Sequence, residues 1–100
     1  MLKVGDIVRI KTWEEMLEDK NVYEDSYEYL VHEDFPELFN TLMREHCGEI
    51  ITIKECDIDD SCNGNFKYDG FYFSPWTYTI IGNINESNQT CIIKTGQNLL

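Results

Sequence analysis

Apolar and polar residues alternate with a period of two at the start of the chain. In residues 3–11, Val8 and Ile10 fall on one face of a strand, and the residues between them fall on the other. The Gly5–Asp6 step before them is typical of a turn or bulge. The pattern therefore predicts a half-buried strand that directs Val8 and Ile10 into the core.

The spacing becomes helical at residue 12. Thr12 is followed three positions later by Glu15, which is the pattern of a capping box at a helix start. The apolar residues that follow lie at positions i, i+3 and i+4 and form one stripe, consisting of Trp13, Met16 and Leu17. We expect a short helix that ends near Lys20 and docks on a sheet.

Residues 34–47 carry a second and longer helical pattern. Asp34 can cap its start, Pro36 suits the first turn, and Gly48 is expected to end it. The apolar positions recur at helical spacing: Phe35, Leu38, Phe39, Leu42 and Met43. Residues 21–33, between the two predicted helices, are rich in acids, and we interpret them as irregular, with room for a short strand.

From residue 49 the period returns to two. Ile51 and Ile53 share one face of a predicted strand, and the Asn63–Gly64 pair indicates a hairpin turn. Residues 77–82 and 90–94 predict two further short strands, and Pro75 marks a break or an edge.

The predicted fold class is α+β, in one domain of 100 residues. A first strand covers residues 3–11, an acidic helical insertion residues 12–47, the remaining strands residues 48–94, and a tail residues 95–100. Four to five short antiparallel strands, with the insertion between strands 1 and 2, close most naturally into a small bent barrel.

The segment KVGDIVRI, a helical insert, the segment CGEIITI and a later aromatic strand with Trp76 follow one another along the chain. This order resembles the small SH3-like barrel proteins of phages and mobile elements, over most of residues 3–82. The resemblance implies a binding scaffold and a phage origin, and it carries no catalytic residue to this chain.

Composition narrows the class of protein. Nineteen acidic residues against eight basic ones give a net charge of −11, and 42% of the residues are hydrophobic, which favours a folded domain. The chain has no run of about 18 apolar residues, and its start lacks the features of a signal peptide. We therefore expect a cytoplasmic protein without a membrane partner, with its cysteines reduced: Cys47, Cys56, Cys62 and Cys91.

The acids concentrate in the insertion, where residues 12–40 contain ten acids and a single Lys, Lys20. We do not expect this region to bind nucleic acid directly, because its carboxylates would repel the phosphates of the backbone. Two interpretations remain: a solvated surface, or an inhibitor-like surface whose carboxylates replace phosphates in the basic groove of a nucleic-acid-binding protein. The partner-binding candidates are Glu18, Asp19, Tyr23, Glu24, Asp25, Tyr27, Glu28, Tyr29, Glu33 and Asp34.

A calcium loop is the strongest metal motif. Asp59, Ser61 and Asn63, followed by Gly64, match its opening, but its twelfth position is Gly70 where a bidentate Glu is needed, so a hairpin is the favoured interpretation. The candidate ligands are Asp57, Asp59, Ser61 and Asn63. The cysteines and His46 include no C-x-x-C pair, so zinc is disfavoured. We expect no metal and no cofactor.

Catalysis is also disfavoured. His46 and Cys47 are neighbours on a predicted helix, where adjacent side chains point about 100° apart, so they do not form a dyad. The prediction is a non-enzymatic protein-binding module. The alternatives are a metal-dependent or thiol-dependent activity centred on residues 56–64, and an assembly component that associates through a strand edge or the segment FYFSPW.

Overall fold

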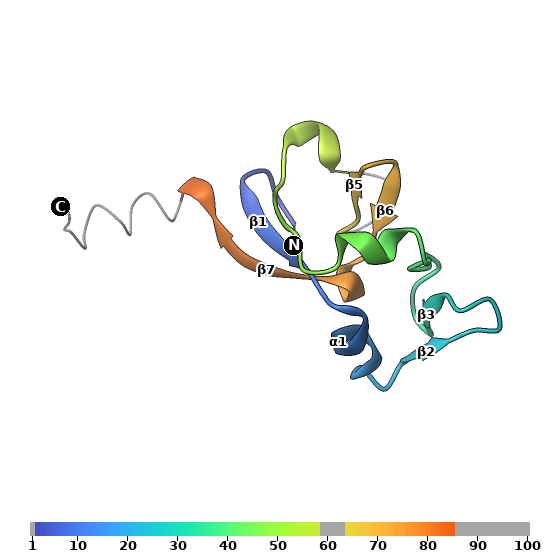
Figure 1. The fold of residues 1–100 in the computed structure, drawn as a ribbon. Helices are drawn as coiled ribbons and strands as arrows, with labels where there is room; N and C mark the ends of the chain where they lie inside the picture. The colour runs from blue at the N-terminus through green and yellow to red at the C-terminus, as the bar shows by residue number, and fades with distance from the viewer. Residues whose placement is uncertain (1, 59–63, 86–100) are drawn as a thin grey trace.

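The computed structural model describes residues 2–58 and 64–85, whose short elements are arranged in three antiparallel sheets (Figure 1). The sheets have the strand orders β4-β1-β7, β2-β3 and β5-β6. In chain order the elements are β1 (Asp6–Ile10), α1 (Trp13–Leu17), β2 (Val22–Glu24), β3 (Leu30–His32), η1 (Met43–His46), β4 (Ile50–Thr52), η2 (Glu55–Asp57), β5 (Phe66–Tyr68), β6 (Phe71–Phe73), η3 (Pro75–Thr77) and β7 (Tyr78–Asn83), where η denotes a 3-10 helix. The predicted α+β class with antiparallel strands is confirmed at this level.

Strand β1 is the centre of the three-stranded sheet. Val8 lies opposite Ile51 of β4 and Ile80 of β7, and the register with β7 shifts at Val8, as at a bulge. Val8 and Ile10 are fully buried, as their alternation predicted. The Asp6 N–H donates to the Lys3 carbonyl, 3.1 Å away, which makes the expected turn before the strand.

Helix α1 begins with the predicted capping box. The Glu15 N–H donates to Thr12 Oγ1 at 3.1 Å, and the Thr12 N–H donates to Glu15 Oε1 at 2.8 Å. The helix ends at Leu17, three residues before the expected end at Lys20. It ends early because the Val22 N–H donates to the Asp19 carbonyl, in a turn that leads directly into β2.

The segment interpreted as irregular is a β-hairpin. Strands β2 and β3 pair over three positions, from Val22 opposite His32 to Glu24 opposite Leu30. Val22 and Leu30 are buried, so the base of the hairpin belongs to the core.

The helix expected over residues 34–47 is wrong. Phe39 exchanges both backbone hydrogen bonds with Leu30, at 2.8 and 2.9 Å, so these groups cannot serve a helix. In this segment only Met43–His46 is helical, as the 3-10 helix η1. Phe39 and Met43 are buried, but Leu42 from the same predicted stripe is 66% exposed.

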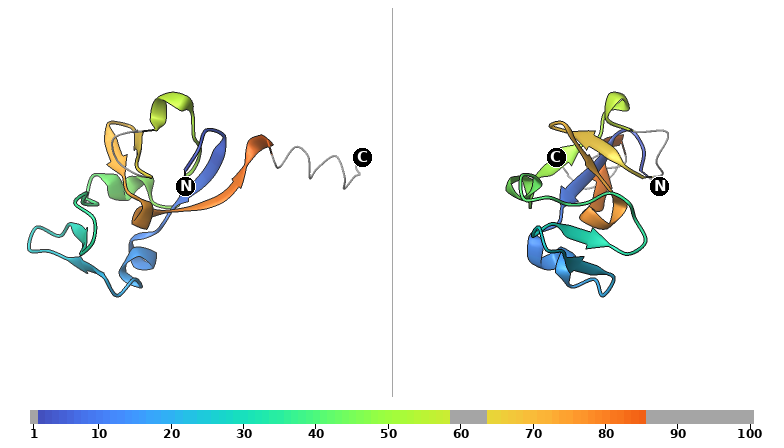
Figure 2. Two further views of the ribbon diagram at one scale, coloured as in Figure 1. Left: turned by 180° about the vertical axis from the view of Figure 1, so that it is seen from behind. Right: turned by 90° about the vertical axis from the view of Figure 1, so that its right-hand side faces the viewer.

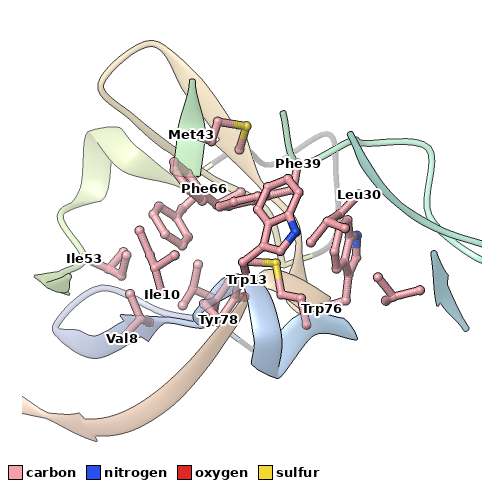
Figure 3. Packing of buried hydrophobic residues seen from close by; sticks show 14 residues of the cluster. Val8, Ile10, Trp13, Leu30, Phe39, Met43, Ile53, Phe66, Trp76 and Tyr78 are labelled. Carbon is pink, nitrogen blue, oxygen red and sulfur yellow. The ribbon is translucent and has the colours of Figure 1, made fainter. Parts of the chain in front are cut away.

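One aromatic core joins the three sheets (Figure 3). The ring of Phe39 meets the edge of Trp13 at 6.0 Å and that of Phe73 at 6.1 Å between centroids, and Phe73 stacks on Phe66 at 5.1 Å. Because Phe39 lies in the insertion and Phe73 in β6, the core holds these two parts of the chain together.

The β5-β6 hairpin turns at Asp69 and Gly70, whose φ angles are 53° and 80°. Two successive positive φ angles are typical of a type I′ turn, which Asp-Gly favours. The predicted turn pair Asn63–Gly64 is a different one, and Asn63 lies outside the described residues. An isolated bridge joins Ile58 to Phe66.

The remaining strand predictions have mixed outcomes. Ile53 is buried, in agreement with the alternation that begins at residue 49, but β4 ends at Thr52 and Glu55–Asp57 form the 3-10 helix η2 where the strand pattern was expected to continue. Strand β7 confirms the prediction for residues 77–82, and Pro75 begins η3 after the end of β6. The strand predicted at residues 90–94 and the tail at 95–100 lie outside the described part of the chain. Within residues 2–58 and 64–85, no helix has the length and apolar character to cross a membrane.

Candidate protein-binding surface

Residues 18–34, here named the acidic hairpin, contain strands β2 and β3 and all ten predicted partner-binding residues. The tip of the hairpin extends away from the body of the molecule in Figure 1 and in the left view of Figure 2. Seven acids stand in this segment against one Lys, Lys20. The fold therefore gathers the predicted residues on one projecting element.

The tip is ordered by the carboxylate of Asp25. Its Oδ1 accepts hydrogen bonds from the backbone N–H groups of Tyr27 at 2.9 Å and Tyr29 at 3.0 Å. The Asp25 N–H donates to the Tyr29 carbonyl, and Glu28 takes a left-handed conformation with φ of 65°. The short loop is thus held in one shape by its own side chain.

Tyrosine rings are the exposed apolar part of the acidic hairpin. Tyr27 is 75% exposed and Tyr23 is 50% exposed. The rings of Tyr27 and Tyr29 lie 6.2 Å apart between centroids, close enough to interact. Tyrosine is favoured at protein interfaces because it combines a large apolar ring with a polar hydroxyl.

The base of the hairpin is tied to the body through His32. Its Nδ1 accepts the Asp34 N–H at 3.0 Å, which leaves Nε2 to donate to Asp19 Oδ2 at 3.3 Å. The ring packs against Phe35 and Trp76, with centroids 5.0 and 5.8 Å away. The sequence alone gave His32 no role, and its only local signal was the Asp two positions later.

The seven acids among the ten predicted residues therefore divide into two groups. Asp25 orders the tip, and Asp19 serves the base, where the Asn21 N–H and then the His32 ring lower the pKa of its carboxyl. These two carboxylates already have partners within the chain. The tyrosines apart, the others are acids exposed to solvent and available to a partner: Glu18, Glu24, Glu28, Glu33 and Asp34.

The described residues give little support to a metal-dependent or thiol-dependent activity. No group of three His, Cys, Asp or Glu residues in this part of the chain could hold a metal ion. Asp57 Oδ2 accepts the Lys54 N–H at 2.9 Å, so it caps η2. The other candidate ligands, Asp59, Ser61 and Asn63, lie outside the described residues.

The two cysteines within the described ranges are free thiols. Cys47 is half-buried, and burial raises the pKa of its thiol, while Cys56 is exposed. Both ring nitrogens of His46 face carboxylates, so neither is directed to the thiol of its neighbour Cys47. Cys62 and Cys91 lie outside the described residues.

Comparisons with known proteins assign no family to this chain. No family model, no curated protein and no solved structure matches it. The geometry of the acidic hairpin is therefore the basis for a functional assignment.

Proposed function

We propose that this chain is a non-catalytic protein-binding module whose acidic hairpin occupies the basic groove of a nucleic-acid-binding protein and so inhibits it. The observation that carries the proposal is the projecting hairpin itself, with exposed carboxylates around the exposed rings of Tyr23 and Tyr27. The carboxylates take the place of nucleic-acid phosphates, and the rings supply apolar contact area.

Charge and shape contribute at different stages of binding. A cluster of negative charge accelerates the encounter with a basic surface and excludes partners of the same sign. A loop that is already ordered loses less conformational entropy on binding. Because Asp25 orders the tip, the rings of Tyr27 and Tyr29 are presented before the partner arrives.

We also propose that the sheets form an SH3-like barrel of phage type, on which the acidic hairpin is an inserted arm. Two features support this assignment: β1 pairs with both β4 and β7, and an isolated bridge between Ile58 and Phe66 joins the chain that follows β4 to β5. In such an arrangement the barrel is the scaffold and the inserted arm carries the specific role.

The proposal is tested by neutralising three glutamates in the acidic hairpin and, in a separate variant, three glutamates elsewhere on the surface. The hairpin variant is Glu24→Gln, Glu28→Gln and Glu33→Gln, which spares Asp25. The matched control is Glu14→Gln, Glu45→Gln and Glu55→Gln, three exposed acids on α1, η1 and η2. Both variants have the same net charge.

Immobilised wild-type protein is used to capture binders from a bacterial lysate at low salt, and the retained protein is identified by mass. We expect a basic nucleic-acid-binding protein that salt or duplex DNA displaces. The hairpin variant should bind it about tenfold or more weakly, with a smaller dependence of Kd on salt, and the control variant should not. Equal losses in the two variants, or no retained protein, would contradict the proposal.

Strand β7 favours self-association as a second candidate function. It is an edge strand of its sheet, it carries no charged residue, and Ile80 and Ile81 are 44% and 50% exposed. Uncharged, apolar strand edges are sites of strand addition. Sedimentation equilibrium distinguishes the candidates: a dimer that Ile81→Lys converts to monomer supports assembly, and a monomeric wild type excludes it.

A further inference from the structure

His46 lies between two carboxylates. Its Nδ1 is 2.7 Å from Glu49 Oε2, and its Nε2 is 3.0 Å from Asp69 Oδ2. The residue is only 8% exposed. A neutral imidazole has one N–H, so its other nitrogen would face a carboxylate with lone pair against lone pair. The protonated ring satisfies both contacts, because it donates from both nitrogens.

Charged groups and aromatic rings from several elements surround the imidazole of His46. Glu49, just before β4, and Asp69, in the β5-β6 turn, supply the negative charges. The Tyr68 hydroxyl donates to Glu49 Oε1 at 2.8 Å, which fixes the second oxygen of that carboxylate. The rings of Tyr68, Phe71 and Phe73 surround the imidazole, with centroids 5.3, 6.3 and 6.2 Å away.

This cluster joins parts of the chain that are distant in sequence. His46 is the last residue of η1, where the insertion ends, and Asp69 is 23 positions further on, in the turn between β5 and β6. The left-handed conformation of Asp69 belongs to the type I′ turn, so the contact forms only when this turn is in place. The cluster thus fastens the β5-β6 turn to the end of the insertion.

We propose that His46, Glu49, Tyr68 and Asp69 form a pH-operated latch, which holds the β5-β6 turn against η1 while the imidazole is protonated and releases it when the imidazole loses its proton. Deprotonation removes one of the two hydrogen bonds and the charge that attracts both carboxylates. The turn then loses its polar contact with η1, and Asp69, which is largely exposed, can move into solvent.

The direction of titration agrees with this geometry. Burial lowers the pKa of His46, but the hydrogen bonds that the ring donates to Glu49 and Asp69, together with their negative charge, outweigh burial, and the net pKa lies above the ordinary 6.5. The hydrogen bonds from His46 and Tyr68 lower the pKa of Glu49 from its ordinary 4.5. The latch therefore contributes its full stabilisation between these ordinary values, and loses it as pH rises through the raised pKa of His46.

The test uses the other histidine as a reference within the same molecule. The carbon-bound ring protons of His46 and His32 are followed by NMR from pH 5 to pH 9 in the wild type, in Asp69→Asn and in Glu28→Gln. We expect His46 to titrate above pH 6.5, and at lower pH in Asp69→Asn. Asn-Gly also favours a type I′ turn, so this variant keeps the hairpin. Glu28→Gln removes an equal charge from the acidic hairpin and should leave the titration of His46 unchanged.

Amide hydrogen exchange at Gly70 and Phe71 reports the release itself. Base-catalysed exchange accelerates about tenfold per pH unit even when the structure does not change. As His46 loses its proton, we expect a further acceleration of about threefold or more at these two amides. This further acceleration should be absent in His46→Gln. If His46→Gln does not fold, Asp69→Asn should already exchange faster at pH 6. A His46 midpoint at or below 6.5, an unchanged midpoint in Asp69→Asn, or no excess exchange would each overturn the latch.

Discussion

Two turn glycines have the same backbone conformation but different surroundings. Gly64 and Gly70 have φ angles of 83° and 80°, where an L-residue is strained. A Cβ on Gly70 would meet nothing within 4 Å, whereas a Cβ on Gly64 would lie 2.8 Å from Cγ of Pro75. The Gly64 carbonyl also accepts a hydrogen bond from the hydroxyl of Tyr78, so a shift of Gly64 would disturb this contact as well.

These surroundings predict unequal costs for the same substitution. Gly70→Ala should lower the free energy of unfolding by about 1–2 kcal/mol, the cost of the left-handed conformation alone. Gly64→Ala should cost this amount plus about 1–3 kcal/mol for the displacement of Pro75. Urea denaturation of both variants measures the difference. Equal losses would mean that the contact with Pro75 relaxes at no cost.

At the scale of the element, two substitutions of Asp25 distinguish the effect of its hydrogen bonds on the hairpin tip from the effect of its charge. Asp25→Asn removes the charge but keeps an oxygen that can accept from the N–H groups of Tyr27 and Tyr29. Asp25→Ala removes both contacts. We expect amide exchange at Tyr27 and Tyr29 to accelerate about fivefold in Asp25→Ala and little in Asp25→Asn, because each amide loses a hydrogen bond worth about 1 kcal/mol. Similar exchange in the two variants would show that the loop is ordered by its backbone alone.

Local interactions explain which elements were predictable from sequence. The start of α1 was predicted because Thr12 and Glu15 bond each other within one turn of chain. The segment at residues 34–47 was not, because the backbone of Phe39 pairs with Leu30, a partner that no local pattern indicates. The turn at Asp69–Gly70 carries as strong a local signal as Asn63–Gly64, and the pairing of β5 with β6 shows that a hairpin forms at Asp69–Gly70.

The candidate surface was predictable in composition but not in the roles of its residues. Charge and aromatic content selected the acidic hairpin, and the structure places these residues on one element. The roles of Asp19 and Asp25 depend on distances within a hairpin that was interpreted as irregular. The cluster around His46 brings together groups 23 positions apart in sequence, so only the folded chain contains it.

For the whole molecule, the charges that have partners within the fold set a pH range of greatest stability. The bidentate hydrogen bonds of Arg9, with the Thr12 N–H, lower the pKa of Glu15 to about 2. This carboxylate therefore stabilises the fold fully above its ordinary 4.5, and its contribution is lost as pH falls from 4.5 towards 2. The contribution of His46 has the opposite sign, since it is complete below 6.5 and is lost as pH rises above that value.

Self-repulsion acts in the same direction as His46 on the alkaline side. A net charge of −11 opposes the compact state, and it falls in magnitude as pH approaches the isoelectric point near 4.3.

We therefore expect thermal unfolding, followed from pH 3 to pH 9, to show the highest Tm between pH 4.5 and 6.5. Glu15→Gln should flatten the acid side of this profile, because the variant has no carboxylate to protonate. His46→Gln should flatten the alkaline side, and added salt should flatten what remains there, since salt screens the repulsion between surface carboxylates. An alkaline side that His46→Gln leaves unchanged would mean that surface repulsion alone lowers the stability there. A maximum above pH 7.5 would contradict both explanations, because His46 and the repulsion each predict falling stability as pH rises towards that value.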